Sequence, residues 1–182
     1  GGRGKSSTSM KEDDIIHHLI VTSNHATVLF FTTRGKVYRL KAFEVPIASR
    51  GAKGRPMVNL LPLEGNENIT AILPIREFAE NQYIFMATAS GTVKRVTLEQ
   101  FSNIRANGLR AIELSDDDTL IGVAITDGEQ QIMLFSNEGK AIRFSETDAR
   151  VMGRTAKGVR GMRVSLAAAQ AEEDSETDVD SD

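Results

Sequence analysis

Arginine recurs at equivalent positions in three segments of this sequence, and its guanidinium group is suited to bind phosphate oxygens in pairs. Each segment is anchored on a glycine, at Gly35, Gly91 or Gly139, and carries an arginine four residues later. Basic residues recur in four sets, which are Arg39, Arg95 and Arg143; Arg50, Arg105 and Arg154; Arg55, Arg110 and Arg160; and Lys53 with Lys157. In a stack of repeats, equivalent positions project in equivalent directions. The four sets therefore predict a basic stripe along one rim, which is typical of a surface that binds a polyanion.

The overall charge of −3 hides this basic surface. Residues 164–182 contain seven acids and no lysine or arginine, so residues 1–163 carry 22 basic against 18 acidic side chains, a net charge of +4. Three windows, 34–55, 91–110 and 139–163, hold 18 of the 22 basic residues, which favours nucleic acid as the partner. The candidate nucleic-acid-binding residues are Arg3, Lys5, Lys36, Arg39, Lys41, Arg50, Lys53, Arg55, Lys94, Arg95, Arg105, Arg110, Lys140, Arg143, Arg150, Arg154, Lys157 and Arg160.

The first set of arginines has a second interpretation. Arg39, Arg95 and Arg143 each share a strand face with an apolar residue two positions earlier. Their stems could pack between sheets while their guanidinium groups pair with acids, and both roles stay open for them. The loops Arg50–Arg55 and Arg154–Arg160 are too polar to enter a core, so we expect their basic side chains to contact the polyanion.

No pattern in the sequence indicates catalysis or metal binding. Cysteine is absent, which excludes disulfides, thiolate metal sites and a cysteine nucleophile. Adjacent His17 and His18 would point to opposite faces of a strand, and His25 lies in a predicted turn. Asp116–Asp118 is predicted to be a solvated turn, and Gly4-Lys5-Ser6 lacks the preceding glycine of a phosphate-binding loop. We therefore expect no catalytic residue, no metal and no cofactor in this chain.

Each copy of the repeat is predicted to form four short strands around its anchor glycine. An apolar run opens the copy, at 19–21, 69–75 or 120–125, and the glycine turns the second strand into the third, which carries the arginine. After a loop with at most one turn of helix, a fourth strand is expected to close the same copy. The helical turns are expected around Phe43, Phe101 and Asp148, and the fourth strands within 57–63, 109–114 and 159–164.

Four-stranded units at a spacing of about 50 residues predict an all-β, propeller-like fold of antiparallel blades. Closed propellers have roughly 4–8 blades, so three blades would belong to a larger ring, stand as an open arc or pair with another copy. The expected organisation is a flexible lead-in at 1–14, three blades over 15–164 (about 15–63, 68–114 and 119–164), and a disordered acidic tail at 165–182.

The ends and the apolar content of the chain bear on where the protein works. No apolar run approaches the roughly 20 residues that a membrane helix needs, so no membrane contact is expected. The start, Gly1 to Lys5, has no signal-peptide stretch, which fits a cytoplasmic protein. Because the chain begins with glycine rather than methionine, we expect a fragment of a longer protein.

Five segments together resemble one known family, the C-terminal β-pinwheel domains of DNA gyrase A subunits. These segments are Arg34–Leu40, Ala48–Pro56, Val58–Leu63, Phe85–Lys94 and Gly158–Gly161, and the resemblance covers about residues 1–164. Gly1-Gly2-Arg3-Gly4 is similar to the end of the family's wrapping motif, Gln-Arg-Arg-Gly-Gly-x-Gly, whose first three residues would precede residue 1.

The resemblance implies a bacterial type IIA topoisomerase, in which this domain wraps duplex DNA so that strand passage introduces negative supercoils at the expense of ATP. It implies the rest of the A subunit and the B subunit as partners, and a cytoplasmic, nucleoid-associated location. The DNA-cleaving tyrosine and the sites for ATP and magnesium would lie elsewhere, since Tyr38 and Tyr83 do not match the tyrosine motif. Two alternatives stay open: the related domain of topoisomerase IV, and a propeller-type protein-interaction module with an apolar contact surface.

Overall fold

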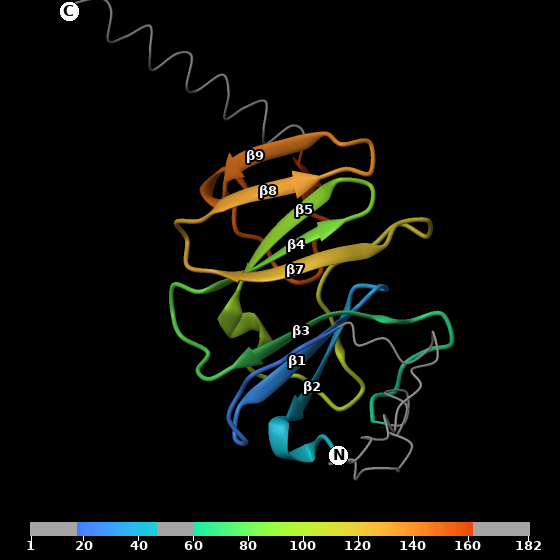
Figure 1. Cartoon of the computed structure of the whole chain (residues 1–182), viewed down its shortest axis with the longest axis vertical. Coiled ribbons are helices and arrows are strands. Elements are labelled where there is room, and N and C mark those ends of the chain that lie inside the picture. Colours follow the sequence, from blue (N-terminus) through green and yellow to red (C-terminus); the bar gives the residue numbers. More distant parts are fainter. Residues whose placement is uncertain (1–17, 47–59, 162–182) are drawn as a thin grey trace, which may run out of the picture.

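The computed structural model describes residues 18–46 and 60–161 of the 182-residue chain, and strands make up most of the regular structure there. The strands are β1 (Thr27–Thr32), β2 (Lys36–Lys41), β3 (Ile69–Ile75), β4 (Tyr83–Thr88), β5 (Thr92–Thr97), β6 (Leu109–Arg110), β7 (Leu120–Thr126), β8 (Gln131–Phe135), β9 (Ala141–Ser145) and β10 (Val159–Arg160). Short 3₁₀ helices, η2 (Ala42–Glu44), η4 (Leu98–Phe101) and η5 (Glu146–Asp148), follow β2, β5 and β9. Figure 1 shows the sheets stacked along the longest axis of the molecule.

Three hairpins, β1–β2, β4–β5 and β8–β9, form where the sequence predicts them. Their turns contain Gly35, Gly91 and Gly139, which have φ angles of 79°, 90° and 77°. Glycine adopts this left-handed region without the steric cost that a Cβ imposes. The three helical turns predicted after the third strands are present as η2, η4 and η5. The local part of the repeat is therefore confirmed.

The sheets do not follow the copies of the sequence repeat. One four-stranded antiparallel sheet has the order β3-β1-β2-β6, a second has the order β10-β5-β4-β7, and β8-β9 form a two-stranded sheet. β3 and β6 come from the second copy and flank the hairpin of the first, while β7 and β10 come from the third copy and flank the hairpin of the second. The prediction that a fourth strand closes its own copy is wrong.

Main-chain hydrogen bonds at the turn glycines show why the fourth strand joins the preceding copy. The Ala111 N–H donates to the Gly35 carbonyl at 2.8 Å, and the Gly161 N–H donates to the Gly91 carbonyl at 2.8 Å. Each fourth strand is thus fixed beside the turn of the copy before it. The four-stranded antiparallel blade is confirmed, and each of the two complete blades is built from two neighbouring copies.

A buried carboxylate holds the first strand of the second copy, β3, and of the third copy, β7, to the hairpin of the preceding copy. Glu67, two residues before β3, accepts a 2.7 Å hydrogen bond from the Thr32 hydroxyl and a 3.1 Å bond from the Tyr38 hydroxyl. Asp118, two residues before β7, accepts hydrogen bonds from the Ser90 N–H at 3.0 Å and the Ser90 hydroxyl at 2.7 Å. We call Glu67 and Asp118 the latch carboxylates, because each joins a first strand to the hairpin of the preceding copy.

The apolar core lies between the sheets. Leu29 and Phe31 of β1 pack with Ile84 and Met86 of β4 and with Phe101 of η4 in the largest cluster, and all five are buried. A second cluster places Phe85 and Val93 of the middle sheet against Phe144 of β9. Burying side chains of this size contributes about 1.5–3 kcal/mol each, so the stacking of one sheet on the next supplies much of the stability.

Two of the predicted strands are absent from the described residues. Leu19–Val21 has no regular structure, and Leu60–Leu63 contains no strand, while residues 57–59 lie outside the described residues. Leu19–Val21 pairs with no hairpin among the described residues, which leaves its backbone without the partner that β3 and β7 have. The predicted lead-in at 1–14 and the predicted acidic tail at 165–182 also lie outside the described residues.

Candidate nucleic-acid interface

Two basic side chains face each other across the first sheet. Lys36 at the start of β2 and Arg110 at the end of β6 are direct antiparallel partners, and Arg110 is exposed. Like charges directly opposite each other destabilise a sheet by a few tenths of a kcal/mol or more. The pair therefore places two cations side by side at the β6 edge of the first sheet. We call Lys36 and Arg110 the cross-strand basic pair.

The same position on the next sheet is also basic. Arg160 of β10 pairs with Thr92 of β5, as Arg110 pairs with Lys36, and the Arg160 side chain is exposed. The turn glycines Gly35 and Gly91 hold both short strands through the hydrogen bonds described above. The structure therefore brings two members of the third basic set to equivalent places on neighbouring sheets. The third member, Arg55, lies outside the described residues.

Arg105 and Arg154 of the second basic set line one open concave surface. Its volume is about 860 Å³, and its lining also includes Ser102, Asn103 and Asn107. The loop that carries Arg105 is held from below by Phe101 and Ile104, which are buried in the core. Glu99 contributes the acidic side chain of this lining. We call this surface the arginine groove. Its guanidinium and amide groups can donate hydrogen bonds to a row of phosphates. The third member of the set, Arg50, lies outside the described residues.

Lys94 has a structural role instead of the predicted contact with nucleic acid. Its side chain is buried, and the ammonium group donates hydrogen bonds to the carbonyls of Ala111 at 2.9 Å and Arg154 at 2.5 Å. Burial, reinforced by the nearby Arg154 charge, lowers the pKa of Lys94 to about 8. Lys94 ties the middle hairpin to loops of the second and third copies, and its prediction as a surface contact is wrong.

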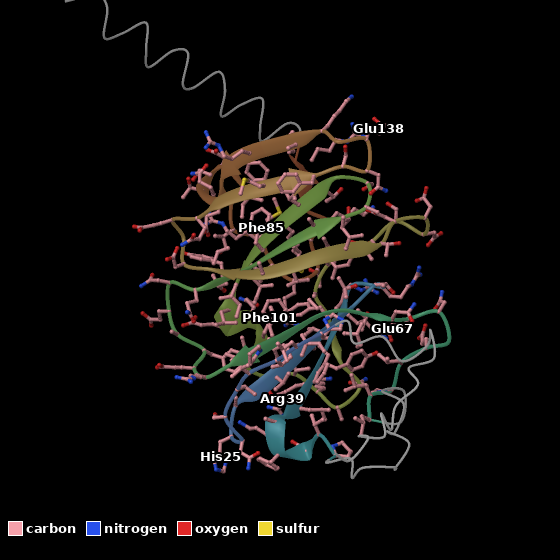
Figure 2. The ribbon with its side chains drawn as sticks, viewed as in Figure 1. His25, Arg39, Glu67, Phe85, Phe101 and Glu138 are labelled. Atoms are coloured by element: carbon pink, nitrogen blue, oxygen red, sulfur yellow. The ribbon has the colours of Figure 1, made fainter. Side chains whose placement is uncertain are left out.

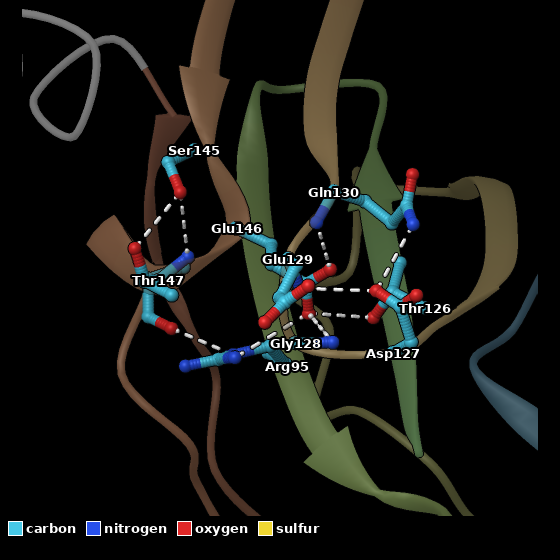
Figure 3. A network of polar contacts seen from close by, with 10 residues as sticks. Arg95, Thr126, Asp127, Gly128, Glu129, Gln130, Ser145, Glu146 and Thr147 are labelled. Atoms are coloured by element: carbon cyan, nitrogen blue, oxygen red, sulfur yellow. Dashed lines mark hydrogen bonds and ion pairs between the residues drawn. The ribbon is translucent and has the colours of Figure 1, made fainter. Parts of the chain in front are cut away.

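Arg95 is buried as well, in the polar network that Figure 3 shows. Its Nε donates to the Ala149 carbonyl at 2.9 Å, one terminal nitrogen lies 3.4 Å from the Glu146 carboxylate, and the guanidinium lies 4.7 Å from the centre of the Tyr83 ring. Glu146 also accepts hydrogen bonds from the Thr126 hydroxyl and two main-chain N–H groups. The structural interpretation is therefore correct for Arg95, and its prediction as a nucleic-acid contact is wrong.

The equivalents of Arg95 remain at the surface. Arg39 and Arg143 are exposed, because η5 and its buried Glu146 cover Arg95 alone of the three. Lys41 is half-buried, and its ammonium group donates to the Thr27 hydroxyl at 3.0 Å. The other exposed candidates are Lys140, Arg150 and Lys157. The candidates Arg3, Lys5, Arg50, Lys53 and Arg55 lie outside the described residues.

The sequence-based search missed the buried carboxylates that hold the surface in place. Asp118 was expected in a solvated turn with Asp116 and Asp117, but it is buried while its two neighbours are exposed. Burial opposes its ionisation, yet hydrogen bonds from Ser90 and Thr88 outweigh burial and lower the pKa of Asp118. The available signal was an acid two residues before an apolar strand, which Glu67 and Asp118 share.

Among the described residues, no helix is long and apolar enough to cross a membrane, and no group of three His, Cys, Asp or Glu side chains is placed to hold a metal ion.

Stacked antiparallel sheets that exchange strands, with basic side chains at equivalent edges, define a propeller-type protein. The chain matches the family described as "DNA gyrase C-terminal domain, beta-propeller" over residues 26–76, 82–127 and 130–168, and it belongs to that family. It is 54% identical to the DNA gyrase A subunit of Haemophilus influenzae over 91% of its own length, and 50% identical to that of Halalkalibacterium halodurans over 89%. It spans about a fifth of the length of each, 19%.

Solved structures confirm the fold. The C-terminal domain of a DNA topoisomerase IV is similar with a TM-score of 0.74 and 28% identity, and the match covers 84% of this chain and 47% of that one. A DNA gyrase A C-terminal domain is similar with a TM-score of 0.61 and 24% identity, over 76% of this chain and 44% of that one. The predicted class, an all-β pinwheel of the gyrase and topoisomerase IV type, is confirmed.

Proposed function

We propose that this chain binds duplex DNA without sequence preference and bends it along the basic edges of its stacked sheets. The observation that carries the proposal is the repetition of exposed arginines: Arg110 and Arg160 occupy equivalent strand positions on neighbouring sheets. Contacts from such side chains to phosphates supply affinity and orientation but read no bases. The arginine groove adds two more cations beside this line.

A basic edge that runs over stacked sheets holds a duplex along its length only if the duplex curves. Bending 20–30 base pairs by 40–90° costs on the order of 1–6 kcal/mol, which the phosphate contacts must offset. If about eight side chains each neutralise a phosphate, the slope of log K against log salt is roughly −7. A slope shallower than about −2 would contradict binding along the whole edge.

Membership of the family supports a role within a larger enzyme. We propose that the chain is part of a gyrase A subunit and acts with the remainder of that subunit and a B subunit, in the cytoplasm of a bacterium and on its nucleoid. There it would wrap DNA for ATP-dependent negative supercoiling. Its own residues would do no covalent chemistry, and ATP and magnesium would be bound elsewhere. In support, both tyrosines of the chain are engaged: Tyr38 is buried against Glu67, and Tyr83 lies under Arg95.

The experiment that tests bending is a change in linking number. Relaxed circular DNA is incubated with the chain, treated with a type I topoisomerase and deproteinised, and its topoisomers are separated on a gel. Wrapping or bending out of plane shifts the distribution in proportion to the bound protein. Saturated binding with an unshifted distribution would contradict wrapping and would leave only binding or a bend within one plane.

A topoisomerase IV origin is the second candidate, favoured by the 0.74 TM-score of that domain. The 54% identity to a gyrase A subunit favours gyrase. A protein-interaction module is less well supported, since the equivalent exposed positions are basic rather than apolar. A protein-interaction module would leave the linking number of the DNA unchanged, and the slope of log K for DNA against log salt would be close to zero.

A further inference from the structure

Lys94 of β5 is a buried cation that its sheet does not require. The side chain is 1% exposed, and within the described part of the chain its ammonium group forms no ion pair with a carboxylate. Keeping a charged group in such a place costs free energy. The equivalent residues of the other two hairpins are Tyr38 and Ile142, so the position also accepts uncharged side chains. The contacts of the ammonium group therefore indicate why a lysine is present.

The ammonium group bridges two chain segments that belong to different copies. Nζ donates one hydrogen bond to the Ala111 carbonyl at 2.9 Å and another to the Arg154 carbonyl at 2.5 Å. Ala111 directly follows β6, in the segment that also carries Arg105, whereas Arg154 lies in the loop between η5 and β10. These two segments supply both arginines of the arginine groove. Lys94 is thus bonded to the main chain on each side of the groove.

The segment that carries Arg105 is held firmly on the first sheet. Phe101, at the end of η4 just before this segment, is buried in the core between the first and the middle sheet (Figure 2). Further along, a Cβ on Gly108 would lie 2.7 Å from the Tyr38 ring, so the chain rests directly on that ring. Arg105 therefore projects from a segment with a fixed position, against which the other arginine can be placed.

The loop that carries Arg154 rests on β5 through the two basic residues of that strand. Arg95 holds the first part of the loop: its carbonyl accepts the Met152 N–H at 2.9 Å, and its Nε donates to the Ala149 carbonyl at 2.9 Å. Lys94 holds Arg154 itself. The buried Nε of Arg154 has no hydrogen-bond partner among the described residues, so the guanidinium group is not tied down through that atom. The bond from Lys94 to the main chain therefore fixes where this arginine begins.

We propose that Lys94 is a positioning residue for phosphate binding, whose ammonium group sets the spacing of Arg105 and Arg154 in the arginine groove. This inference rests on the proposed function, because it takes a DNA backbone as the ligand of the groove. Lys94 is buried and does not line the groove, so it acts through the two arginines and does not touch DNA. Without the ammonium group, two carbonyls lose their donor in a buried place, and the Arg154 loop is expected to move so that they reach water.

The spacing matters because phosphates follow one another at a regular distance along a strand. Two arginines that are already in place bind two phosphates more tightly than two mobile ones, since the loop and the side chains do not have to be ordered on binding. A buried residue that contacts no phosphate can therefore control the affinity for DNA.

The first measurement is a cycle of single and double substitutions in the full chain, with binding followed by the fluorescence anisotropy of a labelled duplex. Lys94→Met and Arg154→Gln are each expected to weaken binding about tenfold, the effect of one lost hydrogen bond to a charged group. The double variant is expected to bind no more weakly than Arg154→Gln alone, because Lys94 acts through Arg154. A loss of about a hundredfold in the double variant would show independent contributions and overturn the proposal.

The second measurement reports the position of the loop without DNA. The chain contains no cysteine, so two nitroxide labels can be attached at chosen sites. Ala106→Cys and Thr155→Cys place the labels on exposed residues, one beside Arg105 and the other beside Arg154. Pulsed electron paramagnetic resonance then gives the distribution of distances between the labels. We expect a narrow distribution with Lys94 in place and a broader or displaced one in Lys94→Met; an unchanged distribution would overturn the proposal.

Ile84→Val is the control for a loss of stability alone. Ile84 is buried in the core and does not line the groove, so this variant should melt at a lower temperature but keep the DNA affinity and the label distances of the wild type. An equal loss of affinity in Ile84→Val would show that stability alone sets the binding, and would overturn the proposal.

Two further outcomes are separated by the same measurements. If circular dichroism shows that Lys94→Met is unfolded, Lys94→Gln takes its place, since its uncharged, shorter side chain is expected to reach at most one of the two carbonyls. If the wild type binds no duplex, the proposed function fails, and the distances between the labels alone decide whether Lys94 holds the Arg154 loop.

Discussion

Thr32 and Glu67 stand 35 residues apart in the sequence, yet the Thr32 hydroxyl donates a 2.7 Å hydrogen bond to the Glu67 carboxylate. The bond joins the hairpin of one copy to the first strand of the next, and Asp118 repeats the arrangement with Ser90. Each joint holds a strand of the next copy within the sheet of the copy before it, and that sheet also carries Arg110 or Arg160 at its edge. Substitutions of the buried polar groups should therefore change the free energy of unfolding, and substitutions of the exposed cations should change the affinity for DNA.

The latch carboxylate Asp118 should make stability depend on pH in the acid range. Its pKa is lower in the folded chain than the usual 3.8, so its contribution is present above that value and is lost as the pH falls through the folded pKa. The substitution Asp118→Asn should lower the free energy of unfolding by about 1–3 kcal/mol at neutral pH. On acidification, the variant should lose less stability than the wild type does. Urea unfolding at a series of pH values measures both effects.

Asp116→Asn is the control for that experiment, because Asp116 is exposed in the same loop. It should unfold like the wild type at every pH. Parallel loss of stability by the wild type and Asp118→Asn on acidification would show that Asp118 is not held in its ionised form by the fold.

Lys94 should make stability rise with pH in the alkaline range. Its pKa is lowered to about 8 in the folded chain, so between about 8 and 10.5 the unfolded chain binds more protons and unfolding becomes less favourable as the pH rises. Lys94→Met should lack this rise. The free energy of unfolding is measured for both proteins from neutral pH to about 10, and their difference isolates Lys94.

Tyr38 does not disturb that comparison. Burial, with the Glu67 charge beside it, raises the pKa of Tyr38 to about 12, so its contribution to stability is lost as the pH rises from about 10 to about 12 in both proteins. An identical pH profile for the wild type and Lys94→Met would show that the Lys94 ammonium group is not desolvated.

The cross-strand basic pair should contribute to DNA binding without contributing to folding. Changing both Lys36 and Arg110 to Gln should reduce the magnitude of the salt slope by about 2, because two phosphate contacts are lost. The free energy of unfolding should stay the same or rise by a few tenths of a kcal/mol, since two like charges no longer face each other. Fluorescence anisotropy with labelled duplex at several salt concentrations measures the slope.

Arg76→Gln serves as the control for charge alone. Arg76 is exposed and lies outside the three basic windows, so its loss should leave the salt slope nearly unchanged. Equal effects of Arg76→Gln and of a single Arg110→Gln would show that the chain attracts DNA by net charge and not through this edge.

Arg95 and Arg143 occupy the same repeat position and should give opposite results. Arg95→Met breaks a buried contact with Glu146 and should cost about 3–5 kcal/mol of stability. Arg143→Met should change stability by less than about 0.5 kcal/mol, because this side chain is exposed, and should weaken DNA binding instead. Thermal unfolding and DNA titration of the two variants make a matched comparison.

The hairpins were predictable because their signals are local. A glycine between two apolar runs is visible in the sequence, and it predicts the tight turn at Gly35 and its equivalents, where φ is near 80°. The exchange of strands was not predictable. The apolar pattern of β7 and β10 indicates which face of each strand is buried, but not which hairpin the strand pairs with. Pairing of Lys36 with Arg110 depends on how the sheets stack, which no short pattern records.

The burial of Arg95 could not be predicted from its position in the repeat. Repeat position alone groups it with Arg39 and Arg143, and only the packing of η5 removes it from the surface. The burial of Lys94 was harder still to predict, since its equivalents are Tyr38 and Ile142 and no acidic residue lies next to it in the sequence. The arginines at edges and loops stay predicted contacts: Arg105, Arg110 and Arg160 are exposed, whereas Arg154 is half-buried.

The exchange of strands also determines how the chain loses its structure. Opening the third copy removes β7 and β10, which leaves β4 and β5 without either neighbour, so damage to one copy spreads to the one before it. Such a chain behaves as a row of units coupled to their nearest neighbours, and its melting is expected to be more cooperative than that of three independent hairpins. Closing each sheet requires residues far apart in sequence to meet, as Lys36 and Arg110 do, and folding dominated by such distant contacts is slow.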